Sequence, residues 1–281
     1  MSAPTILITG CSSGIGLCAA EGLAARGYRV FASARKTQDV AMLQARGLEA
    51  LQLDLDDSAS IQAAVDEVLA RTGGRLDALF NNAGYGQPGA VEDLPRSALR
   101  AQFETNLFGM IELTNCVLPV MRRQAAGRII INSSVLGYVA LAYRGAYNAS
   151  KFAIEGITDT LRLELRGSGV HVALVEPGPI KSRFRANAFN SYQRNITTEQ
   201  SVHRDTYQKL EQRLTKVGPA APFTLGPEAV LEKVIHALES AHPKRRYYVT
   251  KPAYFLAYAK RLLPQALLDR MLGAISDSEV K

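Results

Sequence analysis

The sequence predicts an α/β protein: a doubly wound parallel sheet of about seven strands, helices on both faces, and a C-terminal helical extension. Short apolar, β-branched runs alternate with helical hydrophobic patterns along the chain. A glycine-rich turn joins the first of these runs to the first helix. Of the 281 residues, 47% are hydrophobic and 21% are charged, which suits a sizeable core. We therefore expect residues 1–281 to form one Rossmann-type domain.

The expected strands are Thr5–Ile8, Tyr28–Ser33, Leu48–Leu53, Asp77–Asn81, Arg128–Asn132, Val170–Val175 and Tyr247–Val249. Helical patterns lie between them, for example at Ser60–Arg71, Leu99–Met121, Gly145–Arg166 and Glu228–Ser240. Repeated strand–helix units imply parallel strands with right-handed crossovers. Two segments fall outside the alternation, residues 183–226 and residues 250–281.

The first turn carries three glycines, Gly10, Gly14 and Gly16, between the first strand and the first helix. Glycines also serve ordinary tight turns. A strand, a glycine-rich turn and a helix in succession present free backbone N–H groups and a helix N-terminus to a phosphate. This context favours a dinucleotide site over a plain turn.

The end of the second strand bears on which dinucleotide binds. NAD-binding sheets usually place an acidic residue there for the ribose hydroxyls, whereas an arginine accommodates a 2′-phosphate. This chain has Ala34 at the acidic position, followed by Arg35 and Lys36, and Ser13 offers a further hydrogen bond. A guanidinium can hold a phosphate through two parallel bonds. We expect NADP(H), with NAD(H) as the alternative; the competing interpretation of Arg35 is a solvent-exposed arginine.

Tyr147 and Lys151 lie four residues apart, and Ser134 precedes the tyrosine by thirteen residues. On a helix, positions i and i+4 share a face, so the lysine can lie beside the phenol. A phenol titrates near ~10 in water, and a neighbouring cation brings it closer to neutral pH. With a serine hydroxyl to hold a carbonyl oxygen, the trio suits proton transfer to a ketone or aldehyde. An isolated Tyr-x-x-x-Lys match is more often a surface pair.

Several motifs occur together in one order: Thr9-Gly10-x-x-x-Gly14-Ile15-Gly16, Asp54, Asn81-Asn82-Ala83-Gly84, Asn106, Ser134, Tyr147-x-x-x-Lys151 and Pro177-Gly178. In these residues the chain resembles the short-chain dehydrogenase/reductase family over roughly its first 180 residues. The resemblance implies hydride transfer between NADP(H) and a carbonyl or alcohol. It also implies that Tyr147 exchanges the proton and that Ser134 holds the substrate oxygen. Lys151 would depress the tyrosine pKa and bind the nicotinamide ribose.

The catalytic residues that the resemblance implies are Asn106, Ser134, Tyr147 and Lys151, and of these Ser134 and Tyr147 would touch the substrate. Asn106 resembles the family's helix-bulge asparagine, whose carbonyl holds a water in the proton relay; the alternative is an ordinary mid-helix asparagine. Ser133 competes with Ser134, but the spacing favours Ser134. The implied cofactor-binding residues are Gly10, Ser12, Ser13, Gly14, Ile15, Gly16, Arg35, Asp54, Leu55, Asn82, Ala83, Gly84, Tyr147, Lys151, Pro177, Gly178, Ile180 and Ser182. An alternative role for the aspartates in this segment is helix capping, because Asp56 or Asp57 can cap the following helix. No metal site is expected.

A closer resemblance, to one branch of the family, indicates the class of substrate. Asn82-Ala83-Gly84-Tyr85-Gly86-x-x-Gly89-x-x-Glu92 and the long tail are similar to the hydroxysteroid/retinol dehydrogenase branch and to bacterial aldehyde reductases. This implies a small lipophilic carbonyl or alcohol as the substrate. The alternatives are a polar or acyl-thioester substrate, a non-catalytic NADP(H)-sensing module and a methyltransferase, which would not need the Tyr–Lys pair. Aromatic residues in 183–226 either line an apolar pocket or pin that segment to the body: Phe184, Phe189, Tyr192, Tyr207 and Phe223.

The C-terminal extension, residues 250–281, has leucines at helical spacing with Lys260, Arg261 and Arg270 among them, and Pro264 divides it. We expect an amphipathic helix pair that docks on its own domain. The alternative is a basic surface helix in peripheral contact with a membrane.

The chain carries 33 Lys+Arg against 26 Asp+Glu, a net charge of +7 that suits anionic ligands. It has no dense basic run, so nucleic acid is not an expected partner. Its three cysteines show no CxxC spacing, and neither a secretory signal nor ~18 consecutive apolar residues is visible. We expect a cytoplasmic protein, or one peripheral to a membrane, that forms a homodimer through Leu99–Met121 and Gly145–Arg166, with a tetramer as the alternative.

Overall fold

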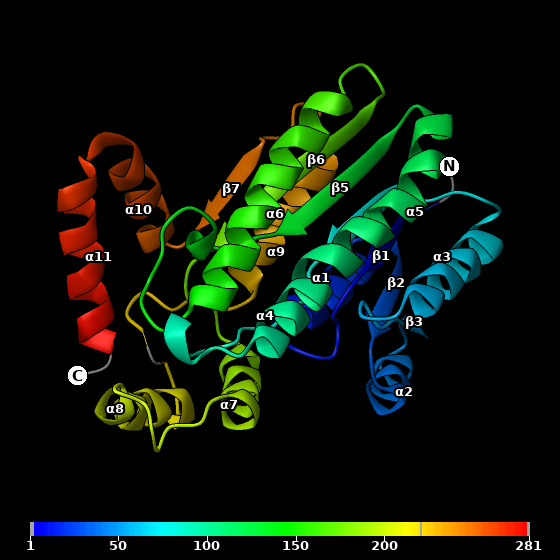
Figure 1. Ribbon diagram of the computed structural model, residues 1–281. Coiled ribbons are helices and arrows are strands. Elements are labelled where there is room, and N and C mark those ends of the chain that lie inside the picture. The colour runs from blue at the N-terminus through cyan, green and yellow to red at the C-terminus, as the bar shows by residue number, and fades with distance from the viewer. Residues whose placement is uncertain (1–2, 220, 280–281) are drawn as a thin grey trace.

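The computed structural model describes residues 3–219 and 221–279. Its centre is a parallel sheet of seven strands in the order β3-β2-β1-β4-β5-β6-β7 (Figure 1). The strands are β1 Thr5–Ile8, β2 Arg29–Ala34, β3 Glu49–Gln52, β4 Ala78–Asn81, β5 Gly127–Asn132, β6 Val170–Pro177 and β7 Arg246–Val249. Every expected strand is present, with bounds shifted by a residue or two. The order reverses between β1 and β4, where doubly wound sheets bind their ligands.

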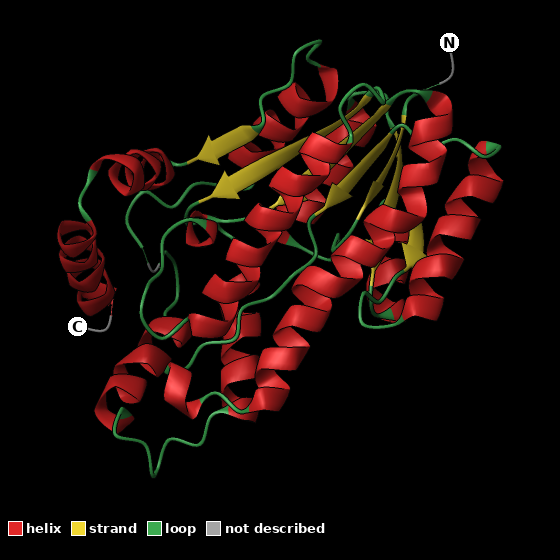
Figure 2. Cartoon of the chain, turned by 45° about the horizontal axis from the view of Figure 1, so that its top comes forward, coloured by secondary structure: helices red, strands yellow, loops and turns green. Residues whose placement is uncertain are grey.

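Helices cover both faces of the sheet (Figure 2). One face packs against α3 Ser58–Thr72, α5 Gly109–Gln124 and α6 Gly145–Glu164. The other packs against α1 Gly14–Ala25, α2 Thr37–Ala45 and α9 Glu228–Glu239. Two short 3₁₀ turns, Val91–Asp93 and Val135–Gly137, lie in the connections. The predicted fold class is confirmed.

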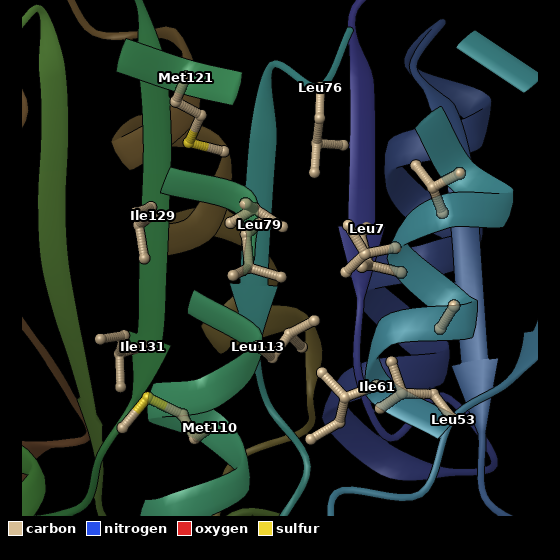
Figure 3. Close-up of a cluster of buried hydrophobic side chains, with 14 of the residues drawn as sticks. Leu7, Leu53, Ile61, Leu76, Leu79, Met110, Leu113, Met121, Ile129 and Ile131 are labelled. Atoms are coloured by element: carbon tan, nitrogen blue, oxygen red, sulfur yellow. The ribbon is translucent and has the colours of Figure 1, made fainter. Parts of the chain in front are cut away.

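The strands alternate their side chains between the two cores, as the pleat requires. Leu7 points into the first core, while its neighbours Ile6 and Ile8 point into the second. Figure 3 shows Leu7, Leu79 and Ile129 from adjacent strands meeting Leu113 of α5. These four side chains have no exposed surface, and full burial of each stabilises the fold by ~1.5–3 kcal/mol. The cores thus hold the strand ends in register.

The expected helix Leu99–Met121 is interrupted. The chain forms α4 Arg96–Phe103, then a π-helical turn at Glu104–Phe108, and then α5. A π-turn adds a residue to the helical repeat and re-aims the side chains around it. Here it directs the buried Asn106 toward the turn after β4. The helical pattern alone therefore predicted wrongly that the helix is continuous here, whereas the resemblance of Asn106 to the family's helix-bulge asparagine agrees with the π-turn.

Residues 183–226 are not an open loop, because they contain α7 Phe184–Asn195 and α8 Arg204–Thr215. Tyr192 and Tyr207 are each 1% exposed, and their ring centroids lie 5.6 Å apart. They pack with Ala90 and Ala146. These two tyrosines therefore pin the segment to the body. Phe223 is 59% exposed, so it neither pins the segment nor lines an apolar pocket.

The C-terminal extension forms α10 Lys251–Leu262 and α11 Gln265–Glu279, divided at Pro264 as expected. Figure 1 shows both helices beyond the β7 edge of the sheet. Leu256, Leu268 and Leu272 pack against Leu136 and Val139 of the connection after β5. The expectation that the tail docks on its own domain is confirmed.

Candidate functional site

The candidate residues converge at the carboxyl edge of the sheet, and hydrogen bonds fix the strand ends to one another. The Thr9 hydroxyl accepts bonds from the backbone N–H groups of Asn82 and Ala83, both at 2.9 Å. The Asn82 amide donates to the Thr9 carbonyl at 2.9 Å, and Asn132 donates to Asn82 Oδ1 at 3.0 Å. The turns after β1, β4 and β5 are thus one hydrogen-bonded unit. We call this unit the cofactor edge.

The glycine-rich turn has the shape of a phosphate cradle. Gly10 and Gly14 have φ of +72° and +56°, a region that favours glycine. A Cβ on Gly16 would lie 2.3 Å from the Gly10 carbonyl oxygen, so only glycine lets α1 begin this close to β1. Ser13 is the N-cap of α1, its side chain makes no capping bond, and the first turn has no acidic residue. These features fit a dinucleotide pyrophosphate.

The residues expected around an adenosine lie at the ends of β2 and β3. Ala34 is buried, while Arg35 and Lys36 are exposed beside it. Arg35 is anchored through its carbonyl, which accepts a bond from Gln52 at 2.9 Å. Leu55 is buried, Asp54 is half-buried, and it is Asp57 that caps α3 by accepting from Ala59 N–H at 3.0 Å. Capping therefore does not account for Asp54.

Ser134, Tyr147 and Lys151 come together between β5 and α6. Lys151 is 5% exposed; its Nζ donates to the Asn132 carbonyl at 2.7 Å and lies 5.7 Å from the Tyr147 ring centroid. The Ser134 hydroxyl accepts from Leu136 N–H at 3.1 Å and lies near enough to the Tyr147 phenol to influence its pKa. Ser133 instead pairs its backbone N–H with Val175. The structure thus places Ser134, not Ser133, beside the tyrosine.

Burial governs the titration of this pair. It raises the pKa of Tyr147 to about 12, although the Ser134 hydroxyl and the nearby Arg144 charge act in the opposite direction. Burial also lowers the pKa of Lys151 to about 8, against a raising effect of the Glu155 carboxylate. Burial therefore has the larger effect on the phenol, and a lowering of the tyrosine pKa by Lys151 stays a prediction. At neutral pH the phenol is protonated and the lysine is charged.

Asn106 connects the π-turn to both the cofactor edge and α6. Its Oδ1 accepts from Tyr85 N–H at 3.1 Å, and its Nδ2 donates to the Tyr85 carbonyl at 3.0 Å. Nδ2 also reaches the Ser150 hydroxyl at 3.2 Å, and that hydroxyl donates to the Tyr147 carbonyl at 2.8 Å. Asn106 therefore holds the turn after β4 against the helix that carries the candidate tyrosine.

The segment after β6 crosses from the glycine-rich turn to Tyr147. A Cβ on Gly14 would lie 2.7 Å from Ser182 Cβ, so Ser182 lies against the cradle. Arg183 donates to the Ser12 carbonyl at 2.6 Å. The Phe184 ring lies 5.3 Å from the Tyr147 ring at 63°. Sequence reasoning named Phe184 among five aromatics, but its place beside the tyrosine follows only from the tertiary structure.

The comparisons with known proteins agree with this geometry. A family model described as short chain dehydrogenase matches residues 4–193. The chain belongs to the short-chain dehydrogenase family of oxidoreductases. It is 43% identical over 268 residues to the uncharacterized oxidoreductase YbbO of Escherichia coli K12, covering 95% of this chain and 93% of that protein.

A human member of the family, 17-beta-hydroxysteroid dehydrogenase type 1, is 37% identical over 265 residues, covering 89% of this chain and 79% of that protein. A solved short chain dehydrogenase/reductase from Burkholderia phymatum, in complex with NAD, is 27% identical with a TM-score of 0.76. The match covers 93% of this chain and 92% of that one.

This short-chain dehydrogenase also carries a buried charged cluster behind the candidate site that the sequence did not predict. The Arg246 guanidinium donates to Glu155, to Glu176 at 2.5 Å and to Asp159 at 2.7 Å. Burial and the Glu155 carboxylate raise the pKa of Glu176. Glu155 lies one helical turn after Lys151 on α6, so the cluster adjoins the candidate lysine. Glu155 and Asp159 lie one helical turn apart on α6, but Glu176 and Arg246 lie farther along the chain, so the four residues form no motif.

Proposed function

We propose that the protein is an NADP(H)-dependent oxidoreductase that interconverts a lipophilic carbonyl compound and its alcohol. The observation that carries the proposal is the setting of Tyr147. Its phenol lies with Ser134 and Lys151 at the cofactor edge, while its ring packs against Phe184 and the apolar cluster of the C-terminal extension. A proton donor in an apolar enclosure suits reduction of a greasy aldehyde or ketone.

A nicotinamide dinucleotide supplies the hydride when it is bound. The glycine-rich turn with Ser12, Ser13 and Ile15 would hold its pyrophosphate, and Asp54 and Leu55 would lie at its adenine. Asn82, Ala83 and Gly84 would hold the ribose, and Pro177, Gly178, Ile180 and Ser182 would hold the nicotinamide. Arg35 and Lys36 support NADP(H), because these two exposed cations follow Ala34, which stands where a carboxylate would repel a 2′-phosphate.

The protein groups then handle the proton. Ser134 would donate a hydrogen bond to the substrate oxygen, and Tyr147 would transfer its proton to that oxygen. The raised pKa of Tyr147 keeps the phenol protonated at neutral pH, which suits an acid in the direction of reduction. The charged Lys151 would stabilise the phenolate left behind. Asn106 would complete the proton path through a water on its backbone carbonyl, while its side-chain bonds hold the π-turn against the helix bearing Tyr147.

Support for a lipophilic substrate comes from the apolar packing around Tyr147. Leu136, Val139, Leu268 and Leu272 form one apolar cluster, and Tyr147 packs against it. The 37%-identical human relative is named for a hydroxysteroid. These apolar side chains would offer a polar substrate no hydrogen-bond partners.

The experiment is an NADPH-oxidation assay against a panel of long-chain aldehydes, retinal and steroid ketones, set beside sugar aldehydes and an acyl thioester, with NADH as the second cofactor. We expect turnover with NADPH on the lipophilic members. Preference for the polar members would contradict the substrate assignment. NADPH binding without turnover of any panel member would favour a cofactor-sensing module instead.

We also propose a homodimer formed through α5 and α6. Exposed apolar side chains lie on these helices and the π-turn before them: Phe108, Phe152, Ile157 and Leu163, which are 41–52% exposed. A shallow depression of about 360 Å³ lies beside Phe108, lined also by Ile111 and Cys116. Light scattering at several concentrations tests the dimer. All three cysteines are free, which suits the reducing cytoplasm as the compartment.

A further inference from the structure

The outward side of α10 carries a surface that the proposed reaction does not use. It consists of Lys251, Tyr254, Phe255, Tyr258, Arg261 and Leu262, and we call it the aromatic–basic face. Tyr254, Phe255, Tyr258 and Leu262 are 44%, 59%, 59% and 76% exposed. They recur at helical spacing, opposite the buried Ala253 and Leu256. Single exposed apolar side chains are common on protein surfaces, but four large ones on one side of one helix form a patch of the kind that marks an interaction site.

The inward side of the same helix is already anchored. Leu256 and Ala259 belong to the apolar cluster against which Tyr147 packs. The Tyr138 hydroxyl donates to the Ala253 carbonyl at 2.7 Å, which fixes the start of α10 to the connection after β5. Figure 1 shows α10 and α11 at the end of the molecule, away from α3 and α5. The aromatic–basic face is therefore held rigidly and points outward.

Charge indicates what covers this face. Residues 251–262 contain no aspartate or glutamate, and Lys251, Lys260 and Arg261 are all exposed. A second copy of the chain across a two-fold axis would bring these cations against their own equivalents, which is repulsive. Anionic lipid headgroups instead attract these cations. Tyrosine and phenylalanine rings insert favourably at the boundary between headgroups and acyl chains. Among the described residues, no helix is long and apolar enough to cross a membrane.

We propose that the aromatic–basic face of α10 docks on an anionic lipid surface, with the helix lying in the plane of the interface. The docked helix separates the bilayer from the apolar wall beside Tyr147 by about 10 Å, the diameter of one helix. A lipophilic substrate dissolved in the bilayer would then enter next to the site. The docking itself does not depend on the proposed reaction.

The test is co-sedimentation of the full chain with sucrose-loaded vesicles, made of phosphatidylcholine alone or with about 30% phosphatidylglycerol. We expect binding to the anionic vesicles that weakens with added salt. The double variant Phe255→Ser with Tyr258→Ser should bind about tenfold more weakly or worse. Lys251→Glu with Arg261→Glu should lose at least about fivefold for each cation that is reversed. All four side chains are exposed, and unchanged melting temperatures check that the variants fold.

Matched controls separate the face from general effects. Phe223→Ser removes a phenylalanine that is also 59% exposed, and Lys209→Glu with Lys216→Glu makes the same change in net charge on and after α8. Both controls should bind vesicles like the wild type. Absence of vesicle binding by the wild type, or equal binding by the α10 variants, would overturn the proposal. So would loss of a dimer by Phe255→Ser with Tyr258→Ser at unchanged lipid binding, because the face would then be covered by a second copy.

Discussion

The cofactor edge and the outer wall of the site are built in different ways. At the cofactor edge, short polar side chains such as Thr9, Asn82 and Asn132 bind backbone and one another at 2.9–3.0 Å. The outer wall, made by α7, α8, α10 and α11, is held by packed leucines and tyrosines. An ion pair also joins Arg213 of α8 to Glu279 of α11 at 3.0 Å.

This difference separates chemistry from substrate choice. Hydrogen-bonded strand ends permit one arrangement of Ser134, Tyr147 and Lys151, because each buried polar atom needs its partner. Apolar packing tolerates changes of shape as long as volume is kept. Substitutions at the cofactor edge should therefore abolish or slow the reaction, while substitutions in the wall should redirect it.

The largest effect is expected at Tyr147. Tyr147→Phe removes the proton donor but keeps the ring that packs against Phe184, so kcat for reduction should fall by about 10²–10⁴. NADPH affinity, measured by fluorescence titration, should change little. Tyr28→Phe, a partly buried tyrosine before β2 at the opposite end of the sheet, is the control. A near-normal rate of reduction by Tyr147→Phe would contradict the claim that the cofactor edge carries the chemistry and the outer wall only the choice of substrate.

Arg35 tests the cofactor side of the comparison. Arg35→Ala should raise the KM for NADPH by about ten- to a hundredfold, since charge-assisted bonds to a 2′-phosphate are lost. The KM for NADH should stay unchanged. Arg46→Ala removes another surface arginine, one paired with Glu21, and should affect neither cofactor. An equal loss for both cofactors would show that Arg35 does not read the 2′-phosphate.

Phe184 tests the wall. Phe184→Ala removes an apolar side chain beside the catalytic candidate, so the KM for a long-chain aldehyde should rise about tenfold. The KM for NADPH should remain close to that of the wild type. Phe189→Ala, on the same helix but stacked on Tyr192, is the matched control. If both variants lose affinity for the aldehyde alike, the effect comes from a loosened α7 and not from contact with the substrate.

The smallest effect concerns the charged cluster behind the site. Burial lowers the pKa of Lys151 to about 8, so the ammonium is charged below this pH and kcat should fall as pH rises through it. Because the Glu155 carboxylate raises that pKa, Glu155→Gln should move the decline to lower pH by about one unit or less. The pH profile of kcat measures it. Glu155→Gln also removes a partner of Arg246, so the melting temperature should fall. A loss of stability alone would leave the pH profile of kcat unchanged.

The sequence predicted the strands and the glycine-rich turn because these depend on local patterns: apolar runs, and glycines at positions with positive φ. Helical periodicity did not predict the π-turn at Glu104–Phe108, since one inserted residue scarcely alters it, and only the resemblance of Asn106 to the family's helix-bulge asparagine pointed there. Nor did the sequence predict the pairing of Arg246 with Glu155 and Glu176, which lie 91 and 70 residues away. Likewise, the nearness of Tyr147 and Lys151 followed from helical spacing, but the burial that governs their pKa values did not.

The central claim is that Tyr147 serves hydride transfer from NADPH to a lipophilic carbonyl. The most direct measurement incubates the protein with decanal and NADPH that carries deuterium at both C4 positions, and follows the alcohol by mass spectrometry. We predict that the wild type yields decanol carrying deuterium at C1, and that Tyr147→Phe, with NADPH bound, yields it at least about a hundredfold more slowly. Unlabelled decanol, or labelled decanol at the same rate from both proteins, would contradict the account.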